Sequence, residues 1–223
     1  MSLDKEVYQK LNVALFTEWK KKNNHKGKPF IEDGIINPEI WFSEDNKPKI
    51  LFVLKEAYGG SYSLTDNLSI KGPWSAMWNR IAEWSYGLLE ASSGNFPEYK
   101  ELQWEEANKY INRVAVMNLR KSDGVKDSSD KVFARYGKED AELLKKQFNL
   151  IDPDIVVYGY TFDAADSIHG LAKKKKQNHN EHWFYKDDLG RLHIDFFHPA
   201  NHYPALLQFY GLLGIYQKAM RKE

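Results

Sequence analysis

Three short apolar runs constrain the fold of this 223-residue chain more than any other feature of its sequence. Unbroken runs of this length are typical of strands that are covered on both faces, as in a parallel sheet. Segments whose apolar residues follow a helical spacing separate the runs, and Pro73 fits the first turn of one of these helices. The runs occupy residues 50–54, 114–117 and 155–158.

Such an alternation of buried strands and helices predicts an α/β fold. Towards the C-terminus, residues 183–185 and 192–197 flank an Asp-Asp-Leu-Gly turn, and this pattern predicts a hairpin. A last helical pattern follows from residue 206. We therefore expect a three-layer α/β/α sandwich around a mostly parallel central sheet of about four strands.

No internal repeat and no linker rich in Pro, Gly or Ser divides the chain, so we expect a single domain over residues 1–223. The first 49 residues should form an N-terminal helix followed by an irregular connection, because turn-forming residues are frequent after residue 26. The core should then extend over residues 50–223.

Composition excludes several classes of protein. Because the chain has no cysteine, it can form no disulfide, Cys-ligated zinc site, iron–sulfur cluster or cysteine nucleophile. A net charge of +1 excludes a uniformly basic nucleic-acid binder, although lysine clusters at residues 20–28 and 173–176 allow a local basic face. No apolar run is long enough to span a bilayer, and the charged N-terminus lacks a signal-peptide pattern. We expect a cytoplasmic protein with no membrane partner.

Polar side chains follow three of the expected strands, and in open α/β sheets ligands bind at the carboxyl ends of the strands. Taken singly, Glu56 is compatible with a surface carboxylate, Asn118 with a turn former and His198 with a loop histidine. Together on one edge, a carboxylate, an amide and an imidazole can position a water, read a polar edge and stabilise a leaving anion. The three segments are Lys55-Glu56-Ala57-Tyr58-Gly59, Asn118-Leu119-Arg120 and His198-Pro199-Ala200-Asn201.

The order of these motifs resembles that of the uracil-DNA glycosylase superfamily. Members carry Gly-Gln-Asp-Pro-Tyr or Gly-Glu-Ala-Pro-Gly after the first core strand, then a strand ending in Asn. An apolar strand introduced by Pro and closed by Gly follows, and a His-Pro-Ser motif precedes the last helix. The matching segments here are residues 54–59, 116–118, 153–159 and 198–201. Without cysteine, the chain resembles the divergent members that hold no iron–sulfur cluster.

This resemblance implies excision of uracil, or of another damaged or deaminated base, from a DNA nucleotide swung out of the stack. Glu56 would position the attacking water or stabilise the oxocarbenium-like sugar, Asn118 would read the base edge, and His198 would stabilise the departing base anion. The resemblance implies no cofactor, and we expect a monomer. It also implies a set of substrate-binding residues: Lys55, Ala57, Tyr58, Gly59, Pro199 and Asn201.

The chain departs from the family pattern at three positions. Lys55 stands where the family has Gly or Gln, Tyr58 stands at the position of Pro, and Ala200 replaces the serine of His-Pro-Ser. Shifting the first motif by one residue aligns Glu56 with the family's Asp and Tyr58 with its Tyr. The aromatic residue that stacks on the base is Tyr62 or Trp74 if either leaves the core.

Two other readings remain open. The scaffold can serve as a non-catalytic module that binds nucleic acid or a nucleotide-like ligand through aromatic rings and lysines. A metal-dependent hydrolase is the second, because imidazole and carboxylate groups are common metal ligands. The candidate ligand sets are His179 with His182, or His198 and His202 with His193 and Asp195.

Overall fold

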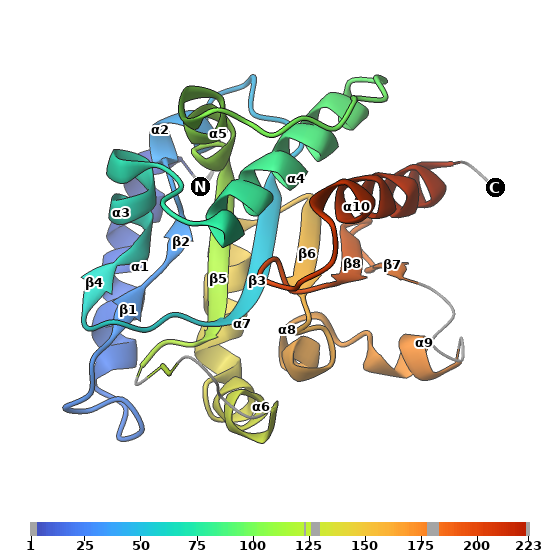
Figure 1. The fold of residues 1–223 in the computed structure, drawn as a ribbon. Coiled ribbons are helices and arrows are strands. Elements are labelled where there is room, and N and C mark those ends of the chain that lie inside the picture. Colours follow the sequence, from blue (N-terminus) through green and yellow to red (C-terminus); the bar gives the residue numbers. More distant parts are fainter. Residues whose placement is uncertain (1–3, 123, 126–129, 178–182, 222–223) are drawn as a thin grey trace.

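The computed structural model describes residues 4–122, 124–125, 130–177 and 183–221. Four parallel strands form the centre of a six-stranded sheet: β5 (Val114–Arg120), β3 (Ile50–Glu56), β6 (Ile155–Gly159) and β8 (Leu192–Phe196), in this order. The antiparallel strands β2 (Gly34–Ile35) and β7 (Phe184–Lys186) flank them (Figure 1). The expected mixed α/β fold with a mostly parallel sheet is therefore confirmed.

The apolar runs are buried because helices cover both faces of the sheet. Successive side chains of a strand point to opposite faces, so a strand covered on both sides needs apolar residues at every position. In β3, Phe52 and Leu54 belong to the core on one face, whereas Leu51 and Val53 belong to the core on the other. All seven residues of β5 are buried.

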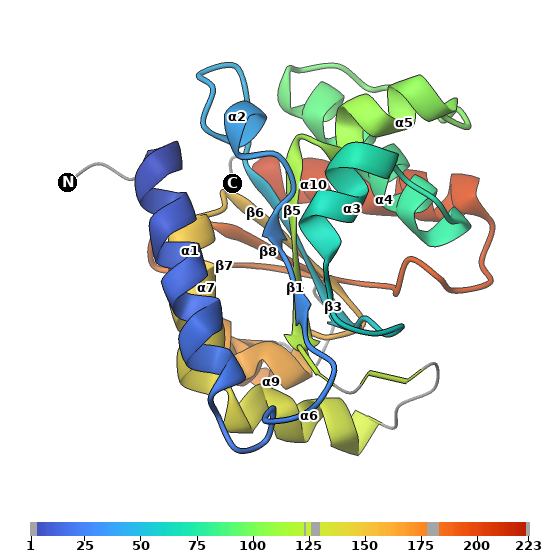
Figure 2. The same ribbon diagram turned by 90° about the vertical axis from the view of Figure 1, so that its left-hand side faces the viewer.

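Figure 2 shows the helices on the two sides of the sheet. One group packs on the face of Phe52 and comprises α3 (Leu64–Lys71), α4 (Ala76–Ser92), α5 (Trp104–Ile111) and α10 (Ala205–Met220). The other face is covered mainly by α1 (Lys5–Lys20), α7 (Ala141–Ile151) and α8 (Asp166–His169), the last preceded by a 3-10 turn (Asp163–Ala165). Helices α6 (Asp130–Glu139) and α9 (Ala172–Gln177) lie near the carboxyl ends of the strands (Figure 1).

The segment that we expected to be an irregular connection contains short elements: β1 (Ile31–Glu32), β2 and α2 (Pro38–Trp41). Strand β1 pairs with β4 (Tyr62–Ser63), and β2 adds an antiparallel edge to β5. Trp19 of α1 and Trp41 of α2 are fully buried in the core on the face of the sheet that α1 and α7 cover. A strand of two residues is too short to give a periodic signal in the sequence. Strands β1 and β2 therefore depend on their pairing with β4 and β5.

Two further expectations concern the ends of elements. Strands β7 and β8 form the expected hairpin, with Tyr185 opposite His193. Helix α4 begins at Ala76 and not at Pro73, so Trp74 lies in the preceding loop. Across the residues that the structure describes, none of the helices is both long and apolar enough to cross a membrane.

Candidate functional site

A cavity of about 650 Å³ lies where β3, β5 and β8 reach their carboxyl ends. It brings together Glu56, Asn118 and His198, which are far apart in the sequence. Lys55, Ala57 and Tyr58 also line it, whereas Gly59, Pro199 and Asn201 do not. Its other lining residues are Leu54, Tyr62, Trp74, Ser75, Met77, Trp78, Val125, Ala200 and His202.

Glu56 is the last residue of β3 and lies opposite Arg120, the last residue of β5. An Arg120 guanidinium nitrogen (Nη1) donates to Glu56 Oε2 at 2.8 Å, and both side chains are only 7% exposed. Arg120 Nε also donates to the Ser122 carbonyl, and the guanidinium lies over the ring of Tyr136. The cavity therefore has a carboxylate whose position is fixed by a buried cation.

Asn118 is oriented by Asp33, a residue that the sequence did not single out. The Asp33 carboxylate accepts the backbone N–H of Asn118 at 2.8 Å and its amide Nδ2 at 3.0 Å. A carboxylate without a proton can only accept, so the amide nitrogen must face Asp33 and the amide oxygen must face away. The same carboxylate also accepts hydrogen bonds from the buried Lys121 and Gln147. Asn118 thus presents Oδ1 and its second amide N–H as the groups left for a ligand in the cavity.

His198 follows β8 and is held in one neutral form. The backbone N–H of Ala200 donates to His198 Nδ1 at 3.2 Å, so the ring proton must sit on Nε2. Burial, together with the nearby charge of Lys55, lowers the pKa of His198 from 6.5 to about 4. At neutral pH the imidazole is therefore uncharged and offers one N–H donor at Nε2.

Pro199 and Asn201 shape the loop of His198 without lining the cavity. Asn201 exchanges two side-chain hydrogen bonds with Gln208 of α10 and donates to the His198 carbonyl at 2.7 Å. Pro199 packs against Gly159, where an added Cβ would lie 3.1 Å from Pro199 Cδ and 2.9 Å from Leu54 Cδ2. These contacts hold the His198 loop against α10 and Gly159, and the expected contact of the two residues with a substrate stays a prediction.

Tyr62 and Trp74, the two candidates for a stacking ring, both line the cavity. Trp74 is 48% exposed and its ring centre lies 5.7 Å from that of Trp78. Gly59 lies in the turn between β3 and β4 with a φ of 104°, a conformation that favours glycine. In the two lysine clusters, Lys22 pairs with Asp140, and Lys175 pairs with Asp163 and Asp195.

The candidate metal ligands are distributed differently from the expectation. His179 and His182 lie outside the described residues, and His202 lines the cavity beside His198. His193 is fully buried with its Nδ1 2.9 Å from the Tyr158 hydroxyl, and Asp195 binds Lys175. Within the described ranges, no three His, Asp or Glu side chains are grouped so that they could hold a metal ion.

Three buried residues, His25, Ser122 and Asp140, form a hydrogen-bonded group next to the carboxyl end of β5. His25 Nδ1 lies 2.6 Å from Ser122 Oγ, and His25 Nε2 lies 2.7 Å from Asp140 Oδ2. The three residue types are those of a hydrolytic triad, but each residue is at most 2% exposed, so no substrate reaches them. They tie the chain after α1 and the start of α7 to the segment that follows Arg120.

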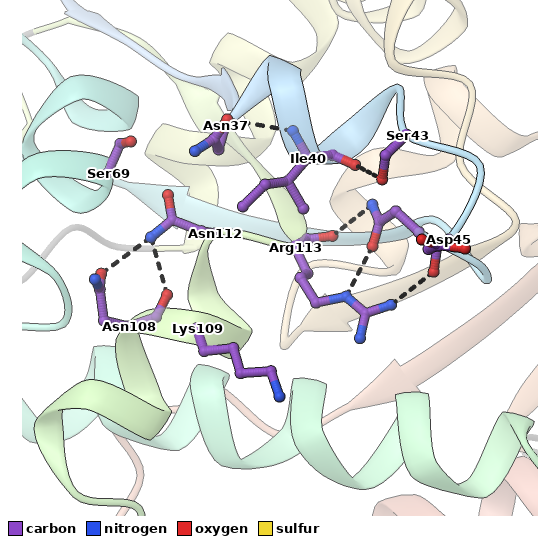
Figure 3. Close-up of a pocket in the computed structure, with 10 residues that line it drawn as sticks. Asn37, Ile40, Ser43, Asp45, Ser69, Asn108, Lys109, Asn112 and Arg113 are labelled. Atoms are coloured by element: carbon purple, nitrogen blue, oxygen red, sulfur yellow. Dashed lines mark hydrogen bonds between the residues drawn. The ribbon is translucent and has the colours of Figure 1, made fainter.

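Another cavity, of about 580 Å³, lies at the other end of the strands, near the residues that precede β3 and β5 (Figure 3). Its polar groups mainly bind one another: Arg113 donates to Asn46 Oδ1 and to the Asp45 carbonyl, and Asn46 donates back to the Arg113 carbonyl. These bonds join the loop before β3 to the start of β5, and the cavity contains none of the predicted site residues.

The sequence analysis named Arg120 in the segment after the second strand but gave it no role, and it did not single out Asp33. Arg120 carried a usable signal, because it closes the same strand as Asn118, two residues later. Asp33 carried none, since its role depends on the pairing of β2 with β5. Comparison with models of known protein families finds no match, and no curated protein matches the chain significantly.

Proposed function

We propose that this protein is a DNA glycosylase-like enzyme that hydrolyses the N-glycosidic bond of a swung-out uracil or another damaged or deaminated base. The observation that carries the proposal is the meeting of Glu56, Asn118 and neutral His198 on one cavity. The four parallel strands with helices on both faces agree with the three-layer, uracil-DNA glycosylase-like sandwich that the sequence resemblance implies.

In this reaction the bond between the base and C1′ of the sugar breaks first, with both bonding electrons leaving on the base. His198 Nε2–H donates to the base oxygen that gains negative charge, and a neutral donor does so without giving up its proton. The Glu56 carboxylate stabilises the oxocarbenium-like sugar and orients the water that adds to C1′. The water proton passes to solvent, and the base anion is protonated after release.

Selection of the base falls to Asn118. Its second amide N–H and its Oδ1 form an adjacent donor and acceptor, which match the O4 and N3–H edge of uracil. A volume of about 650 Å³ lies within the range of small-molecule sites and accommodates a nucleoside. Tyr62 and Trp74 supply rings against which the base can stack.

The test is base release from labelled oligonucleotides that carry uracil or other modified bases, as single and double strands, in the presence of a chelator. Glu56→Gln, Asn118→Ala and His198→Ala should each lower the rate about 100-fold or more under conditions in which the variant is folded, since loss of one oxyanion donor has an effect of this size. Lys109→Ala in the cavity at the other end of the strands should leave the rate unchanged. Equal rates for all three site variants and the parent would contradict the proposal.

The Glu56–Arg120 ion pair favours one alternative. A carboxylate that is already paired is a weaker stabiliser of a cationic sugar, which suits a module that binds nucleic acid without cleaving it. Such a module would bind oligonucleotides with salt-dependent affinity and release no base. A chelator-sensitive activity would instead support the metal-dependent hydrolase.

A further inference from the structure

We propose that a second cavity beside the candidate site binds the neighbouring base of a single-stranded DNA segment, stacked on Tyr160 and Trp183. The inference rests on the proposed function, because it takes the excised nucleotide to occupy the first cavity. It adds that the substrate is a single strand and that two nucleotides are held at once.

The second cavity has a volume of about 540 Å³ and lies beyond the ends of β6 and β8. Two lining residues connect it to the first cavity. Lys55 lines the first cavity and Tyr160 lines the second, and Lys55 Nζ lies 4.8 Å from the centre of the Tyr160 ring. A strand that leaves the first cavity over Lys55 therefore meets the Tyr160 ring next. The lysine is placed to contact the intervening phosphate.

Tyr160 stands in a backbone conformation that glycine adopts more easily. Its φ is +58°, and its N–H donates to the Phe196 carbonyl at 2.8 Å, which fixes the conformation. The residue is 59% exposed, so burial does not compensate for the strain. Strained residues of this kind concentrate at functional sites, and here the strain displays an aromatic ring between two cavities.

Trp183 supplies the second ring from the start of the hairpin. Its indole packs against Phe197, with ring centres 5.3 Å apart, and the residue is 42% exposed. One side of the indole is thus anchored while the rest stays open to a ligand. Aromatic walls bind any base through its π face, so this cavity should show little sequence preference.

The charges of the second cavity favour a base over a phosphate. Two cations and two anions line it, and Lys175 is already paired with Asp163 and Asp195. Lys138 of α6 is exposed at the cavity and can approach a phosphate at its edge. In a duplex each base is stacked on both faces and paired along one edge, so only an unpaired neighbour can enter the cavity.

The experiment measures the affinity of the full chain for three unmodified probes: thymidine monophosphate, a labelled ten-nucleotide thymidine strand and its duplex with the complementary adenosine strand. The single strand should bind more tightly than either of the others. Tyr160→Ala and Trp183→Ala should each weaken single-strand binding about 5- to 150-fold and leave mononucleotide binding unchanged. Tyr160→Phe should retain the affinity, because it retains the ring.

Two variants control for folding. Phe96→Ala removes another exposed ring, which stacks on Tyr210 away from both cavities, and should not change the affinity. Tyr160→Gly relieves the positive φ, so it should unfold at a higher temperature while binding the single strand more weakly. A residue that served only the fold would show the opposite stability change.

Equal affinity for strand and duplex, or unchanged single-strand binding in both alanine variants, would overturn the inference. If the two alanine variants lost the same affinity for the mononucleotide as for the strand, the inference would also be overturned, because the rings would then belong to the first cavity. Base release is measured separately. Ring-dependent strand binding without base release would therefore refute the proposed enzyme and leave the second cavity standing, whereas base release with ring-independent binding would do the reverse.

Discussion

Asp33 decides which end of the Asn118 amide faces the cavity, because its carboxylate accepts Asn118 Nδ2 at 3.0 Å. The same carboxylate is paired with Lys121, and both of these side chains are fully inaccessible to solvent. Asp33 lies at the junction of β1 and β2, outside the three motifs. One residue thus links the orientation of a candidate site group to the stability of the sheet edge.

Asp33→Ala should lower the free energy of unfolding by about 3–5 kcal/mol, since it leaves the buried Lys121 charge without its partner. Denaturant titration measures the change. The double variant Asp33→Ala with Lys121→Met removes the orphaned charge as well and should recover part of the loss. A double variant no more stable than the single one would show that the ion pair is not the cause.

The Glu56–Arg120 pair should show energetic coupling. Both side chains are nearly buried and their charged atoms lie 2.8 Å apart, so each single variant leaves an unsatisfied charged group. Glu56→Gln and Arg120→Met should together cost less stability than the sum of their separate effects, with a coupling of about 1–3 kcal/mol. Unfolding free energies of the four proteins complete this cycle, and additive effects would exclude the coupling.

Because the pKa of His198 is lowered in the fold, the free energy of unfolding should fall in acid. This pKa is about 4 in the fold and about 6.5 when free, so the unfolded chain binds the proton more readily between these values. The stability that neutral His198 confers is complete above pH 6.5 and is lost as the pH falls towards 4. Unfolding at pH 7 and pH 4.5 measures the loss, which should be smaller in His198→Asn.

The same pKa predicts the pH dependence of base release. Because His198 is already neutral well below pH 6, the rate should not change with an inflection near pH 6.5. Nitrogen chemical shifts of the ring should show a protonated Nε2 and an unprotonated Nδ1 at pH 7. A rate that halves between pH 7 and pH 6, or a doubly protonated ring at pH 7, would contradict the neutral-donor role.

Gly159→Ala should disturb the loop of His198. The new Cβ would lie 2.9 Å from Leu54 Cδ2 and 3.1 Å from Pro199 Cδ, so the loop or the strand must shift, at a cost of about 1–3 kcal/mol. Base release should fall with it. Gly214→Ala is the matched control, because no atom lies within 4 Å of the added Cβ and alanine favours the helix by about 1 kcal/mol.

If Gly159→Ala were as stable and as active as the parent protein, the close packing of Pro199 would not be what positions His198. Loss of activity without loss of stability would still support positioning, because a shift of the loop can leave the core intact.

The hydrophobic pattern alone predicted three of the four parallel strands, because a strand covered on both faces must be apolar at every position, as residues 50–54 are. Strand β8 was predicted only as part of the hairpin, since its sequence contains His193 and Asp195. It also placed Glu56, Asn118 and His198 at one edge, since the carboxyl ends of parallel strands share that edge. These features depend on local sequence and on a general rule of topology.

The tertiary structure decided everything that depends on contacts between distant segments. Strand β2 exists only through its pairing with β5, and that pairing is what brings Asp33 to Asn118. The His198 tautomer follows from the Ala200 N–H, and the lowered pKa follows from burial and Lys55. Charge state and orientation arise from desolvation and hydrogen bonding in three dimensions, so the sequence supplied the candidate groups and the fold determined their chemistry.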